Sequence, residues 1–275
     1  MSKNKANTMG KTILITGSTD GIGKLTAIKL AKEGHTVFVH GRNKEKLNHV
    51  ISEIKETSGN QNIDGFVADF SDIKAVKQMS EDVKAKIAKL DILINNAGIF
   101  KTSATSKFKG FDIRFVVNYL ASYVLTNGIL PVLQNGNHSR IVNLSSAAQS
   151  HVSDATLAGE SIHDASEAYA QSKLALTMWS FAFAETNPDI ITIAVNPGSL
   201  LNTKMANDAY GQHWSPAEKG VSILYDLAMS TDHENDSGKY FNNDKGVFGN
   251  AHPDAYDDKK ISQLITATKS ILNHE

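Results

Sequence analysis

The sequence predicts an α/β fold in which a doubly wound parallel sheet of about seven strands carries helices on both faces. Short apolar segments alternate with longer amphipathic segments along the 275 residues. The apolar segments have β-branched and leucine side chains at successive positions, which is typical of strands buried on both faces. No repeat, low-complexity tract or linker divides the chain. We therefore expect one domain at 11–275, preceded by a polar tail at 1–10.

The first half of the chain alternates regularly between the two kinds of segment. The expected strands lie at 11–16, 36–40, 62–70 and 90–98. The expected helices between them lie at 21–34, 43–57 and 73–87. In the third of these helices apolar residues recur near every 3.6 positions from Ile73 to Ile87, so that they line one face. Such alternation is what a parallel sheet with crossover helices requires.

The second half continues the alternation with longer helices. Strands are expected at 140–146 and 190–198, with a short last strand at 238–242. Helices are expected at 111–133, around Tyr169 as far as 186, and at 216–229. Pro216 suits the first turn of the last of these helices, where no backbone N–H group is needed. A C-terminal extension at 242–275 is expected to end in a further long helix.

The composition argues against several classes of protein. The 28 Lys and Arg side chains nearly balance 29 Asp and Glu, which gives no sign of a nucleic-acid or anionic-membrane partner. With 0 cysteines the chain has no disulfide or thiolate nucleophile, and no convincing spacing of metal ligands is present. No segment approaches the roughly 18 apolar residues of a membrane span. A cytoplasmic location fits these features and the polar N-terminus.

The first strand leads directly into TGSTDGIGK, where Gly17, Gly21 and Gly23 are spaced G-x-x-x-G-x-G. Glycine allows a tight turn and lets backbone amides approach a pyrophosphate at the N-terminus of the following helix. A glycine-rich turn without a ligand is the alternative. The position between a strand and a helix favours a dinucleotide site. Together with the strand pattern, the turn predicts a sheet of the Rossmann type.

The end of the second strand bears on the choice of dinucleotide. NAD sites often have an acidic residue there, which binds the free 2′-hydroxyl of the adenosine ribose. This chain has Gly41 and Arg42 instead, and an arginine makes charge-assisted contacts with a 2′-phosphate. We therefore expect NADP as the cofactor, with NAD as the alternative. A solvated arginine at the start of the next helix is the competing interpretation.

Tyr169 and Lys173 stand four residues apart in AYAQSKLAL, so on a helix they share one face. A free tyrosine titrates near 10, which is too high for an efficient base at neutral pH. A nearby ammonium group would favour the phenolate and lower that pKa. Two unrelated polar side chains on a helix would have the same spacing, so other motifs have to distinguish the two interpretations.

Four motifs follow one another in the chain, namely TGSTDGIG, NNAG, SS and YAQSK. In this order, at the ends of predicted strands and on the following helix, they resemble the short-chain dehydrogenase/reductase family. The resemblance runs from Lys11 to Phe241 and implies an enzyme that interconverts a carbonyl and an alcohol with a nicotinamide cofactor. The long step from Ser146 to Tyr169 resembles the retinol-dehydrogenase-like and protochlorophyllide-reductase-like branch of that family.

The resemblance implies four catalytic side chains. Asn118 would hold a proton-relay water, Ser146 would orient the substrate's oxygen, and Tyr169 would be the acid/base with Lys173 as its partner. It also implies a larger set of cofactor contacts, distributed over the ends of the strands. This set is Gly17, Ser18, Thr19, Asp20, Gly21, Ile22, Gly23, Arg42, Asp69, Phe70, Asn96, Ala97, Gly98, Tyr169, Lys173, Pro197, Gly198, Leu200 and Thr203. Thr203 stands one position later than in the family's usual pattern.

The substrate site is marked less clearly than the cofactor site. The long loop at 147–168 would border the pocket and could act as a lid, with His151 and His163 in contact with substrate or with solvent. The apolar residues Phe100, Leu200 and Met205 would suit an apolar carbonyl or alcohol, among many other small molecules. The sequence therefore predicts a small-molecule substrate without specifying which one.

Two other functions are compatible with the same fold. A non-catalytic dinucleotide-binding sensor or scaffold is one, although it would not need the full Asn–Ser–Tyr–Lys set. A sugar-nucleotide epimerase or dehydratase shares the tyrosine and lysine but usually has a larger C-terminal substrate region. A hydrolase is disfavoured because the chain has no G-x-S-x-G turn.

The helix around Tyr169 bears on the oligomeric state. Leu174, Met178, Phe181 and Ala182 lie away from the reactive face, so this helix is apolar on more than one side. Many relatives pair through this helix, which implies a homodimer or a homotetramer. The alternative is that the long C-terminal segment covers the same surface.

Overall fold

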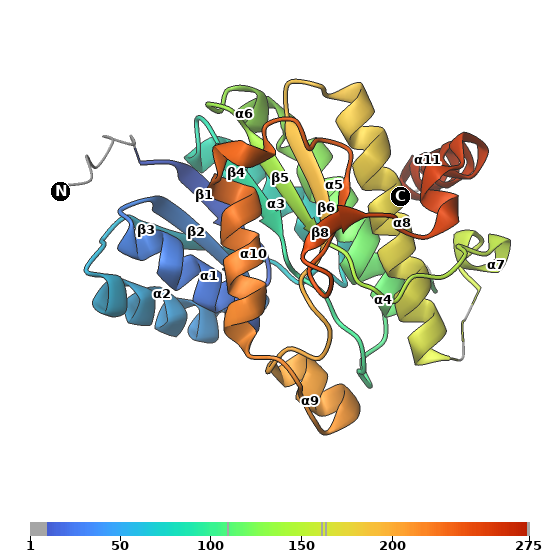
Figure 1. Ribbon diagram of the computed structural model, residues 1–275, viewed down its shortest axis with the longest axis horizontal. Coiled ribbons are helices and arrows are strands. Elements are labelled where there is room, and N and C mark those ends of the chain that lie inside the picture. The colour runs from blue at the N-terminus through green and yellow to red at the C-terminus, as the bar shows by residue number, and fades with distance from the viewer. Residues whose placement is uncertain (1–9, 109, 161, 163, 274–275) are drawn as a thin grey trace.

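A computed structural model describes residues 10–273, except 109, 161 and 163. Most of the predicted polar tail at 1–10, as well as His163, lies outside the described residues. The described chain forms three layers, in which one central sheet lies between two layers of helices (Figure 1). The predicted fold class is therefore confirmed.

Within the described residues, eight strands form the sheet in the order β3-β2-β1-β4-β5-β6-β7-β8. They are β1 (Thr12–Ile15), β2 (Thr36–Gly41), β3 (Ile63–Val67), β4 (Ile92–Asn95), β5 (Arg140–Leu144), β6 (Ile191–Asn196), β7 (Tyr240–Asn242) and β8 (Val247–Gly249). Strands β1 to β7 are parallel, as predicted, whereas β8 runs antiparallel to β7. Strand β8 was not predicted, because its residues Val247–Gly249 are largely exposed and form no buried apolar run.

Helices cover both faces of the sheet. The structure has α1 (Gly21–Lys32), α2 (Lys44–Ser58), α3 (Ile73–Lys86), α4 (Ile113–Phe115), the π-helical turn η1 (Val116–Leu120), α5 (Ala121–Gly128), α6 (Leu130–Gln134), α7 (Asp154–Leu157), α8 (Ala165–Thr186), α9 (Lys204–Tyr210), α10 (Ala217–Met229), the 3₁₀ turns η2 (Thr231–His233) and η3 (Pro253–Tyr256), and α11 (Asp258–Asn273). Helices α1, α2 and α10 cover the face turned to the viewer in Figure 1, and α3, α5 and α8 cover the other.

Two hydrophobic cores lie on the two faces of the sheet. Successive side chains of a strand point to opposite faces. Ile13 and Ile15 of β1 therefore pack in the core with α1, α2 and α10, while Leu14 packs in the core with α3, α5 and α8. Burying one such side chain stabilises the fold by roughly 1.5–3 kcal/mol. Packing on both faces fixes β1, and so fixes the place where the glycine-rich turn begins.

The helix predicted at 111–133 is interrupted, which corrects the sequence-based expectation of one continuous helix. In the π-helical turn η1 the N–H group of Ala121 bonds to the carbonyl of Val116, five residues earlier, so the helix is locally wider. Pro131 has no N–H group and stands in the first turn of α6, so the helical ladder restarts there. The interruption at η1 contains Asn118, one of the predicted catalytic residues.

The loop predicted at 147–168 is partly helical, because it contains α7 and the first turn of α8. The backbone N–H group of Ser153 donates to Oε1 of Gln171 on α8, at 3.1 Å. Nδ1 of His151 lies 2.6 Å from a carboxylate oxygen of Asp254. The imidazole of His151, expected to meet substrate or solvent, is 60% exposed and also joins the loop to the C-terminal extension.

The C-terminal extension packs against α8. The hydroxyl groups of Tyr119 in η1 and Thr268 in α11 are 2.6 Å apart, and the rings of Phe181 and Tyr256 have centroids 5.4 Å apart. Part of the apolar surface that the sequence predicts to be a subunit contact is thus covered by the chain itself. Across the described residues, the search for a helix of sufficient length and apolar character to cross a bilayer finds none.

Candidate active site

The predicted site residues gather along the carboxyl edge of the sheet, because parallel strands all end at the same edge. The chain reverses its direction of winding between β1 and β4, so the turn after β1 lies beside the turn after β4. Open α/β sheets bind ligands at such a reversal. The turn at 16–23, called the glycine turn below, and the NNAG segment at 95–98 meet there.

Two glycines of the glycine turn are required by close contacts with the NNAG segment. Gly17 has φ +61°, and a Cβ atom added to it would lie 2.7 Å from Cα of Ala97. A Cβ atom on Gly23 would collide with the side chain of Asn96 and lie 2.9 Å from the carbonyl oxygen of Gly17. Any larger side chain would therefore push the two segments apart.

Hydrogen bonds join the same two segments. Nδ2 of Asn96 donates to the carbonyl oxygens of Thr16 and Gly17, at 2.8 and 2.9 Å. The backbone N–H group of Ala97 donates to Oγ1 of Thr16, at 3.0 Å. NNAG residues therefore hold the glycine turn in shape, whether or not they also contact a cofactor.

Helix α1 begins inside the glycine turn, with Asp20 as its N-cap. The carboxylate of Asp20 accepts from the N–H group of Gly21 at 2.9 Å and from Nζ of Lys46 at 2.9 Å. A Cβ atom on Gly21 would lie 3.8 Å from the side chain of Thr203. The N-terminus of α1, which is the part of a helix that would bind an anionic group, therefore lies close to Thr203.

The predicted adenosine contacts follow β2 and β3. Arg42 is exposed and comes directly after Gly41, where an added Cβ atom would lie 2.5 Å from the side chain of Thr19. The carboxylate of Asp69 accepts from the backbone and the hydroxyl of Ser71, and from Nζ of Lys107 at 2.9 Å. Partial burial raises the pKa of Asp69, but the bonds from Lys107 and Ser71 outweigh it and hold that pKa below its usual value.

Lys173 is buried beneath the site. Its ammonium group donates to the carbonyl oxygen of Leu144 at 2.6 Å, and its Nζ lies 5.6 Å from the centroid of the Tyr169 ring. A Cβ atom on Gly98 would lie 3.3 Å from Nζ of Lys173 and 3.4 Å from Oδ1 of Asn118. Burial lowers the pKa of Lys173 to about 8, so the group is still charged at pH 7.

Tyr169 stands one turn before Lys173 on α8, and its side chain is half-buried. Its ring meets the ring of Phe100 edge to face, with centroids 4.9 Å apart. Phe100 is itself held in place, because Nε of Arg114 donates to its carbonyl oxygen at 2.7 Å. The buried guanidinium of Arg114 also pairs with Asp112, at 3.0 Å. Tyr169 is thus lined on one side by an apolar ring in a fixed position.

Ser146 follows β5 at the same edge. Its Oγ accepts from the backbone N–H group of Ala148 at 3.1 Å, and its carbonyl oxygen accepts from the hydroxyl of Tyr240 at 2.9 Å. Ser145 is buried, and its hydroxyl donates to the carbonyl oxygen of Lys173 at 3.2 Å. The two serines therefore differ in role, since only Ser146 is partly exposed beside the helix that carries Tyr169.

Asn118 is fully buried in the π-helical turn η1. Its side chain accepts from the N–H group of Ile99 at 2.8 Å and donates to the hydroxyl of Ser172 at 2.9 Å. It therefore connects the segment after NNAG with the helix that carries Tyr169. A π-helical turn often occurs at a functional site, because it widens the helix and changes where its carbonyl groups point.

The segment at 197–203, called the Pro197 segment below, lies at the end of β6. Leu200 has φ +46°, which is strained for a residue with a branched side chain. The backbone and hydroxyl of Ser199 donate to Asp244 at 2.8 and 2.6 Å. Nδ2 of Asn243 donates to the carbonyl oxygen of Pro197 at 2.8 Å. The turn after β7 therefore holds this segment in place.

Sequence reasoning missed three residues that shape the site. They are His40, Tyr240 and Asp244, whose contacts are with the glycine turn, Ser146 and Ser199 respectively. The one signal available for His40 is its place at the end of an apolar strand, where a polar residue reaches the carboxyl edge of the sheet. Tyr240 and Asp244 have no local signal, because their partners lie more than forty residues away in the chain.

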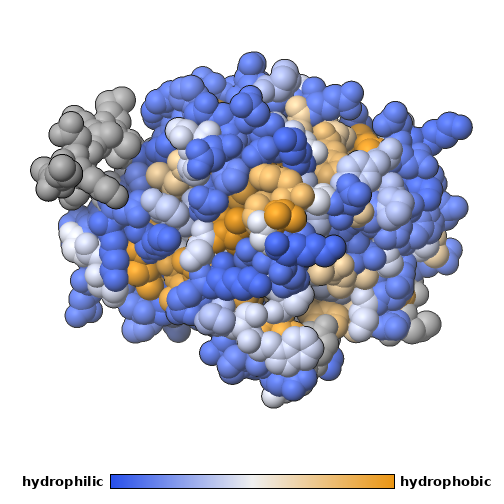
Figure 2. Space-filling model, viewed as in Figure 1, coloured by the Kyte–Doolittle hydropathy of each residue, from blue (hydrophilic) through white to orange (hydrophobic). Residues whose placement is uncertain are grey.

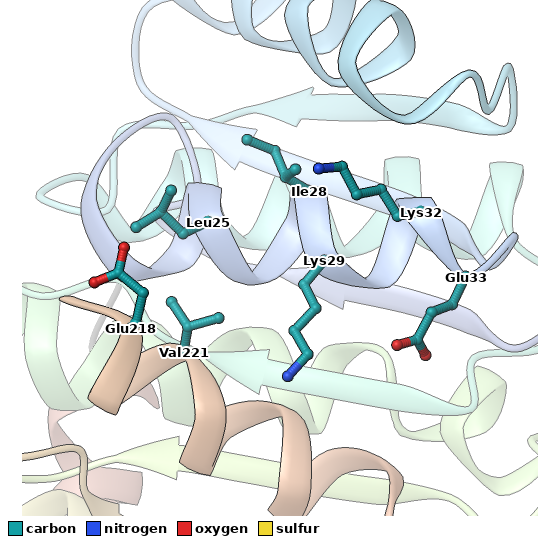
Figure 3. A pocket seen from close by; sticks show the side chains of 7 residues that line it. All are labelled: Leu25, Ile28, Lys29, Lys32, Glu33, Glu218 and Val221. Atoms are coloured by element: carbon teal, nitrogen blue, oxygen red, sulfur yellow. The ribbon is translucent and has the colours of Figure 1, made fainter. Parts of the chain in front are cut away.

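A pocket away from these residues lies between α1 and α10 (Figure 3). It is lined by Leu25, Ile28, Lys29, Lys32, Glu33, Glu218 and Val221. None of the predicted site residues lines it. Figure 2 shows the face over these helices as mostly hydrophilic, with an apolar patch near its centre.

The fold and the gathered side chains define a class of protein, a dinucleotide-binding oxidoreductase whose tyrosine–lysine pair lies at the NNAG segment, next to the glycine turn. The family model described as short chain dehydrogenase matches residues 11–213. The chain therefore belongs to the short-chain dehydrogenase family. Its members act on alcohol and carbonyl groups, and so this protein is an oxidoreductase of that kind.

Particular relatives and structures agree with this assignment. Retinol dehydrogenase 13 of Mus musculus is 31% identical, over 98% of this chain and 85% of its own. Polyprenol dehydrogenase of Homo sapiens is 31% identical, over 84% of this chain and 76% of its own. Similarity to retinol dehydrogenases over most of the chain confirms the retinol-dehydrogenase-like branch.

Two solved structures are also similar. The short-chain dehydrogenase from Shigella flexneri has a TM-score of 0.72 and 26% identity, covering 86% of this chain and 92% of that one. A structure from Escherichia coli CFT073, complexed with NADPH, has a TM-score of 0.69 and 25% identity, covering 86% and 97%. A nicotinamide dinucleotide is thus the cofactor that this fold and family indicate.

The residues present fit such a cofactor. Gly17 and Gly23 leave no room for side chains where the turn approaches the NNAG segment, and helix α1 begins in this turn with its N-terminus close to Thr203. The donors are backbone amides, hydroxyl groups and cations, which suit a pyrophosphate and ribose hydroxyl groups.

Proposed function

We propose that the protein is an NADP-preferring oxidoreductase that interconverts a carbonyl and an alcohol by hydride transfer. In this proposal Tyr169 exchanges a proton with the substrate's oxygen, Lys173 lowers the pKa of Tyr169, Ser146 orients the oxygen, and Asn118 supports a proton relay. The observation that carries the proposal is the convergence of Lys173 and Asn118 on Gly98, one helical turn from Tyr169.

The proton chemistry rests on the charge of Lys173. Its ammonium group is positive below about pH 8 and lies near the Tyr169 ring, at 5.6 Å from the centroid. A positive charge in a low-dielectric site favours a phenolate over a phenol. Tyr169 can then accept a proton from an alcohol or return it to a carbonyl oxygen near neutral pH. When bound, the nicotinamide supplies or accepts the hydride.

Ser146 and Asn118 serve different steps. The backbone bond from Ala148 fixes the rotamer of Ser146, so its hydroxyl hydrogen is available to a substrate oxygen. Asn118 has its amide committed to Ile99 and Ser172, which keeps η1 at a fixed distance from α8. Its place in a π-helical turn supports a role in holding a relay water through the backbone.

The preference for NADP rests on Arg42. Its exposed guanidinium stands at the end of β2 with no acidic residue at the preceding position, so a 2′-phosphate would meet a cation there. The NADPH complex of the similar Escherichia coli structure supports this choice. Titration of the protein with NADPH and NADH, followed by nicotinamide fluorescence, tests it. Tighter binding of NADH would refute the Arg42 assignment.

The substrate in this proposal is an apolar aldehyde, ketone or alcohol. The relatives are named for retinol and polyprenol, both apolar alcohols. In this chain the ring of Phe100 lies against Tyr169, so the substrate's carbonyl would enter next to an apolar surface. A panel of apolar and polar carbonyl compounds with NADPH tests this part.

Tyr169→Phe tests the catalytic assignment. Removing the phenol should lower kcat by roughly 10³-fold, since no other group would deliver the proton. NADPH affinity should change by no more than about twofold, because the ring remains. Tyr123→Phe, which removes a phenol from α5, is the matched control and should keep full activity. Substantial turnover by Tyr169→Phe would contradict the assignment.

Two further properties stay predictions. A cytoplasmic location is predicted from the sequence and is tested by fractionation of cells that express the protein. The packing of α11 and η3 on α8 supports the expectation that the C-terminal segment, rather than a second subunit, covers part of the apolar surface of α8. Gel filtration with light scattering distinguishes a monomer from the homodimer or homotetramer that the family resemblance implies.

A further inference from the structure

His40 is a buried titratable residue that the proposed mechanism does not use. It stands at the end of β2 and is 3% exposed. Its Nδ1 lies 3.0 Å from the backbone nitrogen of Gly17, and its Nε2 lies 3.0 Å from the carbonyl oxygen of Ala68. An N–H group can only donate and a carbonyl can only accept, so the ring is neutral with its hydrogen on Nε2.

The surroundings of His40 keep this state. Burial lowers its pKa to about 4, so the imidazole remains neutral near pH 7. The ring stacks on Phe70, with centroids 4.2 Å apart. Its backbone forms a reciprocal pair with Ser18, in which the Ser18 N–H group donates to the His40 carbonyl and the His40 N–H group donates to Oγ of Ser18, both at 2.9 Å.

These contacts join three segments that come together only in the folded sheet. They are the glycine turn after β1, Gly41–Arg42 at the end of β2, and Ala68–Phe70 after β3. In the proposed function the three segments hold the pyrophosphate, the 2′-phosphate and the adenine. His40 touches none of these groups itself, because its two nitrogens are occupied by Gly17 and Ala68.

We propose that His40 is a positioning residue, which sets the relative positions of these three segments and so preorganises the adenosine half of the cofactor site. The inference rests on the proposed function. Without the imidazole, the N–H group of Gly17 would have no partner on the protein side, and the turn would adopt conformations that satisfy it elsewhere. The binding-competent conformation would then be less populated, and the apparent affinity would fall in proportion.

The test compares His40→Phe with His40→Gln at pH 7. Phenylalanine at position 40 can still stack against Phe70 but makes neither hydrogen bond. Glutamine can accept from Gly17 through its side-chain oxygen and donate to Ala68 through its side-chain nitrogen. We expect His40→Phe to weaken NADPH roughly tenfold, and His40→Gln to bind within about threefold of the wild type. The affinity of the fragment 2′,5′-ADP, measured by calorimetry, should change in parallel.

Two readouts separate positioning from a general structural effect. At saturating NADPH, kcat should stay within about twofold, because the Tyr169 end is untouched. Hydrogen exchange of the Gly17 amide in the ligand-free protein should be faster in His40→Phe and protected again in His40→Gln. The matched control is His35→Phe, a buried histidine before β2 at the opposite edge of the sheet, whose Nδ1 accepts from Lys11. It should leave the affinity for 2′,5′-ADP unchanged.

The outcomes also separate this inference from the proposed function. If the wild-type protein binds neither NADPH nor 2′,5′-ADP, the proposed function fails. If it binds both and His40→Phe binds them equally well, the role of His40 is refuted. If His40→Phe does not fold, His40→Asn replaces it, because asparagine is too short to reach both partners. Equal affinity of His40→Asn and His40→Gln would then overturn the inference.

Discussion

The glycine turn and the Pro197 segment both follow a strand, and in the proposed function they hold opposite ends of one cofactor, yet they are stabilised differently. The glycine turn is fixed by buried groups from three neighbouring strands, with Ser18 and His40 almost fully enclosed. The Pro197 segment is fixed mainly by side chains of the turn after β7, and Ser199 and Met205 beside it are exposed.

This difference has a physical consequence. Hydrogen bonds that are shielded from water resist rearrangement, because a buried donor or acceptor without a partner costs about 1–3 kcal/mol. Hydrogen bonds at an exposed turn exchange with water at little cost. The backbone of Leu200 is strained, and it would relax to a more favourable conformation if the contacts around it were lost. We therefore expect the glycine turn to contribute to the stability of the whole fold, and the Pro197 segment to affect ligand binding more than stability.

The largest expected effect is on Gly17. Gly17→Ala should lower the free energy of unfolding by about 4 kcal/mol, because a left-handed alanine is strained by roughly 1–2 kcal/mol and the clash with Ala97 adds roughly 1–3 kcal/mol. Urea denaturation measures the loss. Gly34→Ala is the matched control, since Gly34 also has a positive φ, +86°, but an added Cβ atom meets nothing within 4 Å. Equal losses in both variants would contradict the importance of the Ala97 contact.

The second-largest expected effect is a loss of folding stability at acidic pH, caused by His40. The folded pKa of His40 is about 4 and its ordinary value is 6.5, so between these values the unfolded chain binds a proton that the folded chain does not. The contribution of His40 is complete above pH 6.5 and is lost as the pH falls through 4, by about 3 kcal/mol. Urea denaturation from pH 7 to pH 4 should therefore show a steeper loss for the wild type than for His40→Gln. Identical slopes would show that folding does not lower the pKa of His40.

The smallest effect concerns Asp244. Partial burial raises its pKa, but bonds from Ser199 and Asn196 outweigh this and hold the pKa below its ordinary value of 3.8. Asp244 therefore stays charged over the pH range in which His40 titrates. Asp244→Asn should raise KM about fivefold, since an amide replaces one acceptor oxygen with a donor, and should cost less than about 1 kcal/mol of stability.

Steady-state kinetics measures the KM of Asp244→Asn, and urea denaturation measures its stability. Asp208→Asn is the control, because it removes the same charge from α9 near the Pro197 segment and should change neither KM nor stability. A loss of stability in Asp244→Asn as large as that of Gly17→Ala, with KM unchanged, would remove the distinction between the two regions.

Much of the fold follows from local patterns. Continuous apolar segments predicted the seven parallel strands, and their alternation with amphipathic segments predicted helices on both faces. The spacing of Gly17, Gly21 and Gly23 predicted a tight turn, and the i, i+4 spacing of Tyr169 and Lys173 placed both on one helix. These inferences hold because backbone conformation and side-chain periodicity are set within a few residues.

Other features depend on which strands are neighbours, and only the tertiary structure decides that. Pro131 marks the restart of the helix at α6 in the sequence, but the π-helical turn η1 and the covering of α8 by the C-terminal extension have no local signature. His40 reaches Gly17 because β1 and β2 are adjacent, and Asp244 reaches Ser199 because β7 lies beside β6. The sequence by itself thus determined the elements and the residue types at the strand ends. The order of the strands decided which of those residues meet, because hydrogen bonds and packing act over a few ångströms of space and not along the chain.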